Sequence, residues 1–137
     1  FSQVEYVKDP ATAIVHFGAD MFMRWVYHPD DWSHEVFVVD ASGRLKQGRP
    51  SRTTIAGPLC FGGDILARDV LVPPIETGDW IGVRDVGAYT LSMWSRHCNR
   101  GLPLVLGYEL NDLPQLSVLR NSESPQDVVR FWSCSEW

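Results

Sequence analysis

The stretch with the clearest capacity for chemistry is a glycine-rich loop around a cysteine, Ala56-Gly57-Pro58-Leu59-Cys60-Phe61-Gly62-Gly63-Asp64-Ile65-Leu66-Ala67. The Gly-Pro pair opens the loop, and the two later glycines allow the backbone to turn tightly. A cysteine on such a loop can act as a general acid, because the ordinary thiol pKa of about 8.5 keeps it protonated at neutral pH. Many reduced cysteines are instead small buried hydrophobic residues. Taken alone, Cys60 fits both interpretations.

A second stretch with chemical potential covers residues 78–93. A polar turn leads into a strand, a Gly-Ala-Tyr corner at residues 87–89 and then a further predicted strand. Tyr89 follows two small residues, so its phenol can be presented to a ligand, and a phenol hydroxyl is a good donor to phosphate oxygens. By itself, Tyr89 is better explained as an aromatic residue of the core or its rim.

The elements that must position these loops are short apolar runs separated by turn residues. Gly and Pro punctuate the chain at intervals of roughly 8 to 12 residues, which is typical of an all-β barrel or sandwich. Residues 36–45 are typical of a strand that enters a turn and could start a hairpin. The predicted strands are Ala13–Phe17, Glu35–Val39, Thr53–Ala56, Asp64–Leu66, Trp80–Val83, Tyr89–Met93 and Leu104–Leu110.

One helix is predicted near the C-terminus. Ser124 provides a capping hydroxyl, Pro125 fits the first helical position, and Asp127 adds a carboxylate in the first turn. Apolar residues then follow at spacings that a short amphipathic helix can use. A second short helix or turn is expected near residues 30–33. No internal domain boundary is apparent, so residues 1–137 are interpreted as a single domain.

Composition excludes several classes of protein. The chain has 137 residues, of which 45% are hydrophobic and 21% charged, so it is globular rather than disordered. The net charge of −5 and the lack of a basic stripe argue against nucleic-acid binding, which needs clustered Lys and Arg. No apolar run approaches the ~20 residues that span a bilayer, and no signal peptide opens the chain, so no membrane role is expected.

The first residue is Phe, which leads us to expect a piece of a longer chain. The three cysteines form no CxxC pair. An odd number without paired spacing argues against a disulfide framework and favours a reducing compartment, the cytoplasm or an organelle.

Taken together, the motifs resemble the C-terminal β-domain of the pyridoxal-phosphate-dependent decarboxylases of the diaminopimelate, ornithine and arginine family. The first segment of that domain is matched by Gly18-Ala19-Asp20, Met23-Arg24 and Tyr27-His28, with Trp25 in place of a family proline. Residues 119–123 resemble its closing segment, and the resemblance runs from Val15 to Trp132. The remaining matching motifs, in order, are Gly57-Pro58-Leu59-Cys60, Asp64, Val72-Pro73, Gly78-Asp79, Gly87-Ala88-Tyr89 and Ser92-Met93.

The resemblance implies a Greek-key-like β-barrel, similar to the C-terminal domain of alanine racemase, with a short C-terminal helix. In such enzymes an N-terminal (β/α)8 barrel holds pyridoxal 5'-phosphate on a lysine, and the β-domain completes the site, usually across a homodimer interface. Lys8 and Lys46 are the only lysines here, and neither lies in a cofactor-lysine motif. The chain alone is therefore expected to be inactive, with its N-terminal domain, a second protomer and an amino-acid substrate as partners.

The resemblance also implies roles for individual residues. Cys60 would protonate the substrate Cα after CO2 has left, and Tyr89 would bind the cofactor phosphate or lie beside the substrate. Arg24 would pair with a substrate carboxylate, which suits a bidentate guanidinium. Tyr27 would assist, although its spacing from Arg24 departs from the family pattern.

Phe61 is a departure from the family. The diaminopimelate and ornithine enzymes place Glu or Asp directly after the cysteine, where the carboxylate reads the distal ammonium of the substrate. An aromatic ring at this position cannot pair a charge. We therefore expect that the substrate is a diamino acid or related amino acid other than diaminopimelate, or that its distal end is read by another residue such as Asp64.

The remaining aromatic and metal-binding residue types give weaker signals. Among the six tryptophans, Trp25 and Trp94 could line a substrate pocket, or they could belong to the core and a dimer interface. The irregular spacing of His28, His34, His97 and Cys98 matches no metal-ligand signature, so no metal is predicted.

Two other functions are compatible with the sequence. One is a regulatory homologue of the decarboxylases that has lost catalysis, although the presence of Cys60 and Tyr89 favours activity. The other is a separate β-sandwich module that binds carbohydrate through exposed tryptophans. A cofactor-lysine domain upstream would favour the enzyme, whereas a start codon just before Phe1 would favour the carbohydrate-binding module.

Overall fold

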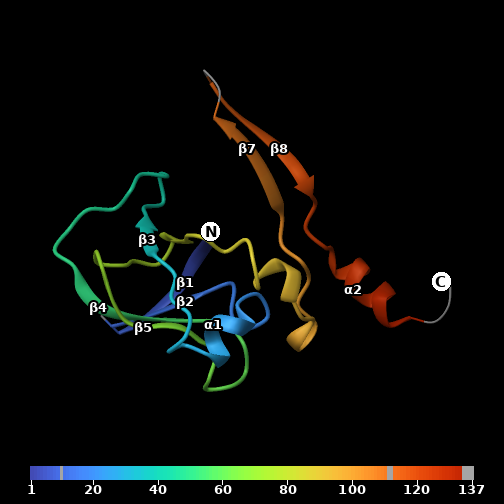
Figure 1. Ribbon diagram of the computed structural model, residues 1–137, viewed down its shortest axis with the longest axis horizontal. Helices are drawn as coiled ribbons and strands as arrows, with labels where there is room; N and C mark the ends of the chain where they lie inside the picture. The colour runs from blue at the N-terminus through green and yellow to red at the C-terminus, as the bar shows by residue number, and fades with distance from the viewer. Residues whose placement is uncertain (10, 111–112, 134–137) are drawn as a thin grey trace. The chain divides into compact units, whose positions relative to one another are not determined.

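The computed structural model describes residues 1–9, 11–110 and 113–133, and the chain divides into two compact units, Phe1–Ser95 and Arg96–Trp137. The first unit contains a curved sheet and a short helix. The second contains a two-stranded ribbon and the C-terminal helix (Figure 1). The division falls where the sequence shows no apparent boundary.

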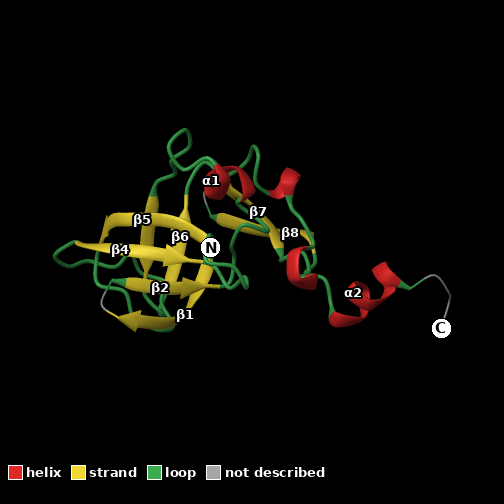
Figure 2. Cartoon of the chain, turned by 90° about the horizontal axis from the view of Figure 1, so that it is seen from below, coloured by secondary structure: helices red, strands yellow, loops and turns green. Residues whose placement is uncertain are grey.

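The first unit is a six-stranded sheet curled into a nearly closed barrel (Figure 2). Its strands lie in the order β3-β6-β1-β2-β4-β5, and the edge strands β3 and β5 approach each other. Neighbouring strands are antiparallel, except that β2 runs parallel to β4. This architecture confirms the predicted β-barrel. The strands are β1 (Ser2–Asp9), β2 (Thr12–Val15), β3 (Val36–Val39), β4 (Ser51–Ala56), β5 (Ile65–Val72) and β6 (Trp80–Val83).

Alternation of side chains explains why these segments form a half-buried sheet. In β2, Ala13 and Val15 are buried while the residue between them is partly exposed. In β4, Thr53 and Ile55 follow the same period of two, which places one face of each strand against the core. The β-branched residues also suit the pleated backbone.

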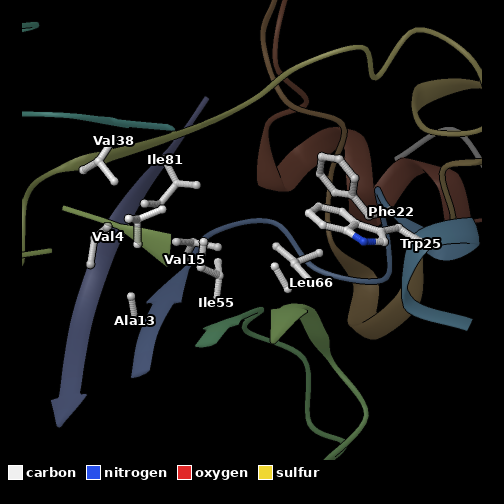
Figure 3. Close-up of a cluster of buried hydrophobic side chains, with 11 residues drawn as sticks. Val4, Ala13, Val15, Phe22, Trp25, Val38, Ile55, Leu66 and Ile81 are labelled. Atoms are coloured by element: carbon white, nitrogen blue, oxygen red, sulfur yellow. The ribbon is translucent and has the colours of Figure 1, made fainter. Parts of the chain in front are cut away.

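The core joins the sheet to helix α1 (Met23–Tyr27). Phe22 and Trp25 are both buried, and their ring centroids lie 5.8 Å apart. Trp25 is thus part of the core, and not the pocket wall that the sequence allowed. Figure 3 shows the cluster, which consists of Val4, Ala13, Val15, Phe22, Trp25, Val38, Ile55, Leu66, Ala67, Val72 and Ile81.

The second unit begins with a 3-10 turn (His97–Asn99) and ends with helix α2 (Pro125–Trp132). Ser124 Oγ accepts a hydrogen bond from the Asp127 backbone N–H at 3.2 Å, and the Asp127 carboxylate accepts one from the Ser124 N–H at 2.9 Å. With Pro125 at the start, this capping box confirms the predicted helix.

Between these helical segments, β7 (Val105–Leu110) and β8 (Pro114–Arg120) form an antiparallel ribbon. Its register places apolar residues opposite one another on one face. The pairs on that face are Leu106–Val118, Tyr108–Leu116 and Leu110–Pro114. All six side chains are exposed.

A charged contact ties the segments of the second unit together. Two nitrogens of the Arg96 guanidinium each donate to one oxygen of Glu123 at 3.0 Å. Glu123 also accepts the Leu102 N–H at 3.0 Å, and the Arg96 guanidinium lies 4.3 Å from the ring centroid of Phe131. The hydrogen bond from Arg96, followed by the one from Leu102, lowers the pKa of the Glu123 carboxyl.

The predicted strand at Tyr89–Met93 is wrong. Tyr89 has a positive φ of 58°, outside the extended region of regular strand residues, and the Thr90 hydroxyl donates to the Val86 carbonyl. These features turn the chain, which continues as a 3-10 helix, Leu91–Met93. Conversely, β1 and β8 form where no strand was predicted.

Two predicted turns are present. After β3, the Asp40 carboxylate accepts the Ser42 and Arg44 backbone N–H groups, and Val39 bridges Leu45. The hydrogen bond from the Ser42 hydroxyl, with the backbone bonds, lowers the pKa of Asp40 to about 2. Near residues 30–33 the chain forms a turn in which two backbone N–H groups donate to the His28 carbonyl.

Candidate functional site

The parallel pairing of β2 and β4 brings the Gly18-Ala19-Asp20 motif next to the cysteine loop. The register pairs Ala13 with Ile55 and Ile14 with Ala56, so both strands end at the same edge of the sheet. Residues 16–20 leave β2 there, and the cysteine loop of residues 57–64 leaves β4. Segments about 40 positions apart in the sequence thereby become neighbours.

Asp64 links these two segments. One carboxylate oxygen accepts the Ala19 N–H at 2.7 Å, and the other accepts the Leu59 N–H, also at 2.7 Å. The Asp64 side chain is buried, with the residue only 3% exposed. We predicted that Asp64 could read a substrate ammonium, whereas here both of its oxygens are engaged by the backbone.

Cys60 is exposed at the outer part of the loop. Leu59 before it is buried, and Phe61 after it is partly buried. The Phe61 ring lies against Gly63, where an added Cβ would come within 2.9 Å of a ring carbon. The loop therefore holds its apolar flanks inward and presents the cysteine to solvent.

Arg24 and Tyr89, predicted from separate motifs, are brought together. The Arg24 guanidinium lies 5.3 Å from the ring centroid of Trp32 and 5.8 Å from that of Tyr89. The two rings pack edge to face with centroids 5.4 Å apart. Both Arg24 and Tyr89 remain exposed, so a cation and a phenol are available to an anionic ligand.

Trp32 is the member of this cluster that the sequence analysis missed. It follows the turn at residues 29–31, and no periodicity marks it as different from the other tryptophans. The one signal in the sequence is the Pro-Asp-Asp stretch directly before Trp32, since these turn residues could fold the chain back toward Arg24.

The segment of residues 18–24 connects the two parts of the site. Gly18 accepts backbone hydrogen bonds from Met21 and Phe22 through its carbonyl, which starts the chain toward α1. Ala19 reaches Asp64, and Arg24 reaches the aromatic pair. Tyr27 lies further along α1 and is exposed.

Two of the histidines make separate contacts. His34 Nδ1 lies 3.1 Å from the Arg84 carbonyl oxygen, and His28 Nδ1 lies 3.6 Å from Asp31. Within residues 1–9, 11–110 and 113–133, no three metal-binding side chains gather into a possible ion site. Over the same ranges, no helix has the length and apolar character to cross a membrane.

A nearly closed barrel that carries an exposed cysteine loop and a cation-aromatic cluster matches a known class of domain. The family model described as "Pyridoxal-dependent decarboxylase, C-terminal sheet domain" matches residues 1–87. The chain belongs to this family, as the sequence motifs predicted.

Several relatives of this chain are enzymes named diaminopimelate decarboxylase. Diaminopimelate decarboxylase of Helicobacter pylori is 34% identical over 135 residues, which cover 95% of this chain and 31% of the relative. The enzyme of the same name from Archaeoglobus fulgidus is 38% identical over 87 residues, covering 61% of this chain and 19% of the relative. A crystal structure of the H. pylori enzyme complexed with L-lysine superposes with a TM-score of 0.78 at 30% identity, over 95% of this chain and 30% of that one. This chain therefore spans about a third or less of the length of these relatives.

Proposed function

We propose that this chain is the C-terminal domain of a pyridoxal-phosphate-dependent amino-acid decarboxylase, in which it completes the active site and supplies Cys60 as the proton donor. The observation that carries this proposal is the exposed cysteine on a loop anchored by Asp64. Family membership supports the cofactor and the class of reaction.

The residues present fit the rim of a pyridoxal phosphate site. Arg24 and Tyr89 offer a guanidinium and a phenol side by side, which suits a phosphate or a carboxylate. Of the two lysines, Lys46 is held by Asp79 at 2.6 Å and Glu76 at 2.9 Å, and Lys8 lies on β1. The attachment lysine is therefore proposed to come from the N-terminal (β/α)8 domain. When bound, the cofactor supplies the electron sink for loss of CO2.

The role proposed for Cys60 is to deliver a proton to the Cα of the substrate. A thiol is ordinarily protonated at neutral pH and can donate to a carbon that has just lost CO2. Because the residue is exposed, the active site of a second protomer can reach it. Its fixed flanks limit the directions in which the thiol can point.

The substrate we propose is a diamino acid or related amino acid other than diaminopimelate. The relatives named above are diaminopimelate decarboxylases, and one was solved with L-lysine, which supports a substrate of this size. Phe61 argues for a different distal group, because its ring packs on Gly63 and offers no charge to an ammonium. Asp64 is too deeply engaged to replace the missing carboxylate.

The partners we propose are the rest of the polypeptide and a second copy of the enzyme. The apolar face of the β7–β8 ribbon is exposed, which a partner surface would explain. Membership of the decarboxylase family leaves the carbohydrate-binding alternative without support. The regulatory homologue remains as an outcome of the test.

The test is decarboxylation by the full-length protein that carries this chain. With pyridoxal phosphate added, a panel of diamino and other amino acids is screened for CO2 release. Cys60→Ala should lower kcat by roughly 10²- to 10⁴-fold, whereas Cys98→Ala, at an exposed cysteine of the second unit, should not. Full activity of Cys60→Ala would exclude the proposed proton donor, and lack of CO2 release from any substrate would favour the regulatory homologue.

Phe61→Glu tests the substrate proposal separately. If the ring excludes an ammonium, the glutamate variant should shift the preference, measured as a ratio of kcat/KM values, toward diaminopimelate. An unchanged ratio would show that residue 61 does not read the distal group.

A further inference from the structure

Asp64 controls both neighbours of Cys60. Its side chain accepts the Leu59 N–H at 2.7 Å, and its own backbone N–H donates to the Phe61 carbonyl at 3.2 Å. The residues before and after the cysteine are thus bonded to one and the same residue. Its backbone carbonyl also accepts the Gly57 N–H at 2.8 Å, which closes the base of the loop.

The other carboxylate oxygen ties this loop to the segment that follows β2. It accepts the Ala19 N–H at 2.7 Å, so the loop is anchored to a part of the barrel outside itself. Ionised acceptors form stronger hydrogen bonds than neutral ones, and a buried carboxylate exchanges none of them with water. The loop is therefore fixed both internally and to the barrel.

The Asp64 carboxylate occupies space that is free because two neighbouring residues are glycines. A Cβ added at Gly18 would lie 2.4 Å from both carboxylate oxygens, and one added at Gly57 would lie 2.2 Å from Asp64 Oδ2. A side chain at either position would displace the carboxylate. Gly62 differs, because a Cβ there would meet nothing within 4 Å.

We propose that Asp64 is a positioning residue that acts through Cys60, holding the thiol at a fixed place relative to the barrel. The inference rests on the proposed function for its effect on turnover, but not for its effect on the thiol. Misplacing a reacting group by about 1 Å can cost a rate factor on the order of 10². Loosening the loop should therefore impair proton delivery while the substrate still binds.

The first experiment measures the thiol itself, without turnover. The full-length protein is alkylated with iodoacetamide, and the rates at Cys60 and Cys98 are compared by mass spectrometry of the peptides. Asp64→Asn replaces one acceptor oxygen by an NH2 group that faces a backbone donor. It should change the ratio of the Cys60 to Cys98 rates about threefold or more in either direction, since the reactivity of a thiol depends on its surroundings. An unchanged ratio would overturn the inference.

Two glycine variants provide an independent test in case the Asp64→Asn variant does not fold. Gly57→Ala keeps the Asp64 carboxylate but pushes it out of position, and should change the same ratio. Gly62→Ala, in the same loop but facing open space, should leave it unchanged. An equal response of both glycine variants would mean that the loop, rather than the carboxylate, governs the thiol.

The second experiment asks whether Asp64 acts through Cys60 during turnover. Asp64→Asn should lower kcat roughly 10- to 100-fold, with KM changed less than about twofold. In a Cys60→Ala background the same substitution should have almost no further effect on kcat. Equal losses in the two backgrounds would indicate a merely structural role. If the protein releases no CO2 at all, the proposed function fails, while the alkylation result still decides the inference about Asp64.

Discussion

The two units of the chain are stabilised in different ways. The barrel is organised around buried aliphatic and aromatic side chains, and every member of this cluster precedes residue 87. Among the described residues from 96 onward, none is buried. The contacts there are the backbone pairing of β7 with β8, the paired charges of Arg96 and Glu123, and the capping box of α2.

This difference separates a unit with a buried apolar core from one whose described residues contain none. The barrel packs a cluster of apolar side chains inside, although Tyr6 and Leu71 among others stay exposed. The ribbon instead presents a row of exposed apolar residues on one face and mainly polar or small ones on the other. An isolated two-stranded ribbon is marginally stable in water. Covering the apolar face of the ribbon should therefore stabilise the second unit.

The largest effect is expected from opening a cavity in the barrel. Ile81 is 0% exposed. Ile81→Ala should lower the free energy of unfolding by about 2–5 kcal/mol, through lost burial and the cavity left behind. Urea unfolding followed by tryptophan fluorescence measures this change. The matched control, Leu116→Ala at an exposed ribbon position, should cost no more than about 0.5 kcal/mol. Equal losses in the two variants would contradict the proposed difference between the units.

A more local effect is expected from removing the charged contact of the second unit. Arg96→Met deprives Glu123 of its two guanidinium hydrogen bonds and of the nearer of its two counter-charges, since Arg120 lies 3.8 Å away. Amide hydrogen exchange should accelerate in α2 and the residues around Leu102, while exchange in β1, β2 and β4 stays the same. Acceleration across the barrel as well would show that the two units unfold together.

The same contact predicts a response to acid. Because the pKa of Glu123 is lowered below its ordinary value of 4.5, its ionised form favours the folded state. This contribution is complete above pH 4.5 and is lost as the pH falls through the lower, folded-state pKa. Hydrogen exchange of α2 should therefore accelerate upon acidification in the wild type. The Arg96→Met variant should show a smaller change, and an equal change in both would exclude the pair as the cause.

The smallest effect is expected at the helix cap. Ser124→Ala removes the hydroxyl that accepts the Asp127 N–H and should cost about 1 kcal/mol of local helix stability. Loss of far-ultraviolet helical signal measures it. Gln126→Ala is the control, because Gln126 lies in the first turn of the helix but takes no part in the capping box. This variant should leave the signal unchanged. If both variants lose it equally, helix propensity rather than capping explains the result.

Local patterns predicted much of the fold. The strand at Trp80–Val83 was predicted at its observed bounds, and the helix after Ser124 follows from its capping residues. Strand β1 was not predicted, because register irregularities after Val4 and Val7 interrupt its alternation. Strand β8 was missed because both of its faces are exposed.

The site was only partly predictable for a different reason. The motifs indicated Cys60, Arg24 and Tyr89, since each lies in a short distinctive stretch. The contacts that position them depend on long-range pairing. Asp64 meets Ala19 only because β2 and β4 run side by side, and Trp32 meets Tyr89 across more than fifty residues. No local pattern carries that information.

The parallel alignment of β2 and β4 also bears on how such a domain can change during evolution. The chain between these strands must travel the full length of the barrel, and it does so through exposed turns such as residues 41–45. Insertions there would lengthen the route without altering where either strand finishes. Changes of length in the connecting segment should therefore leave the cysteine loop at the same end of β4.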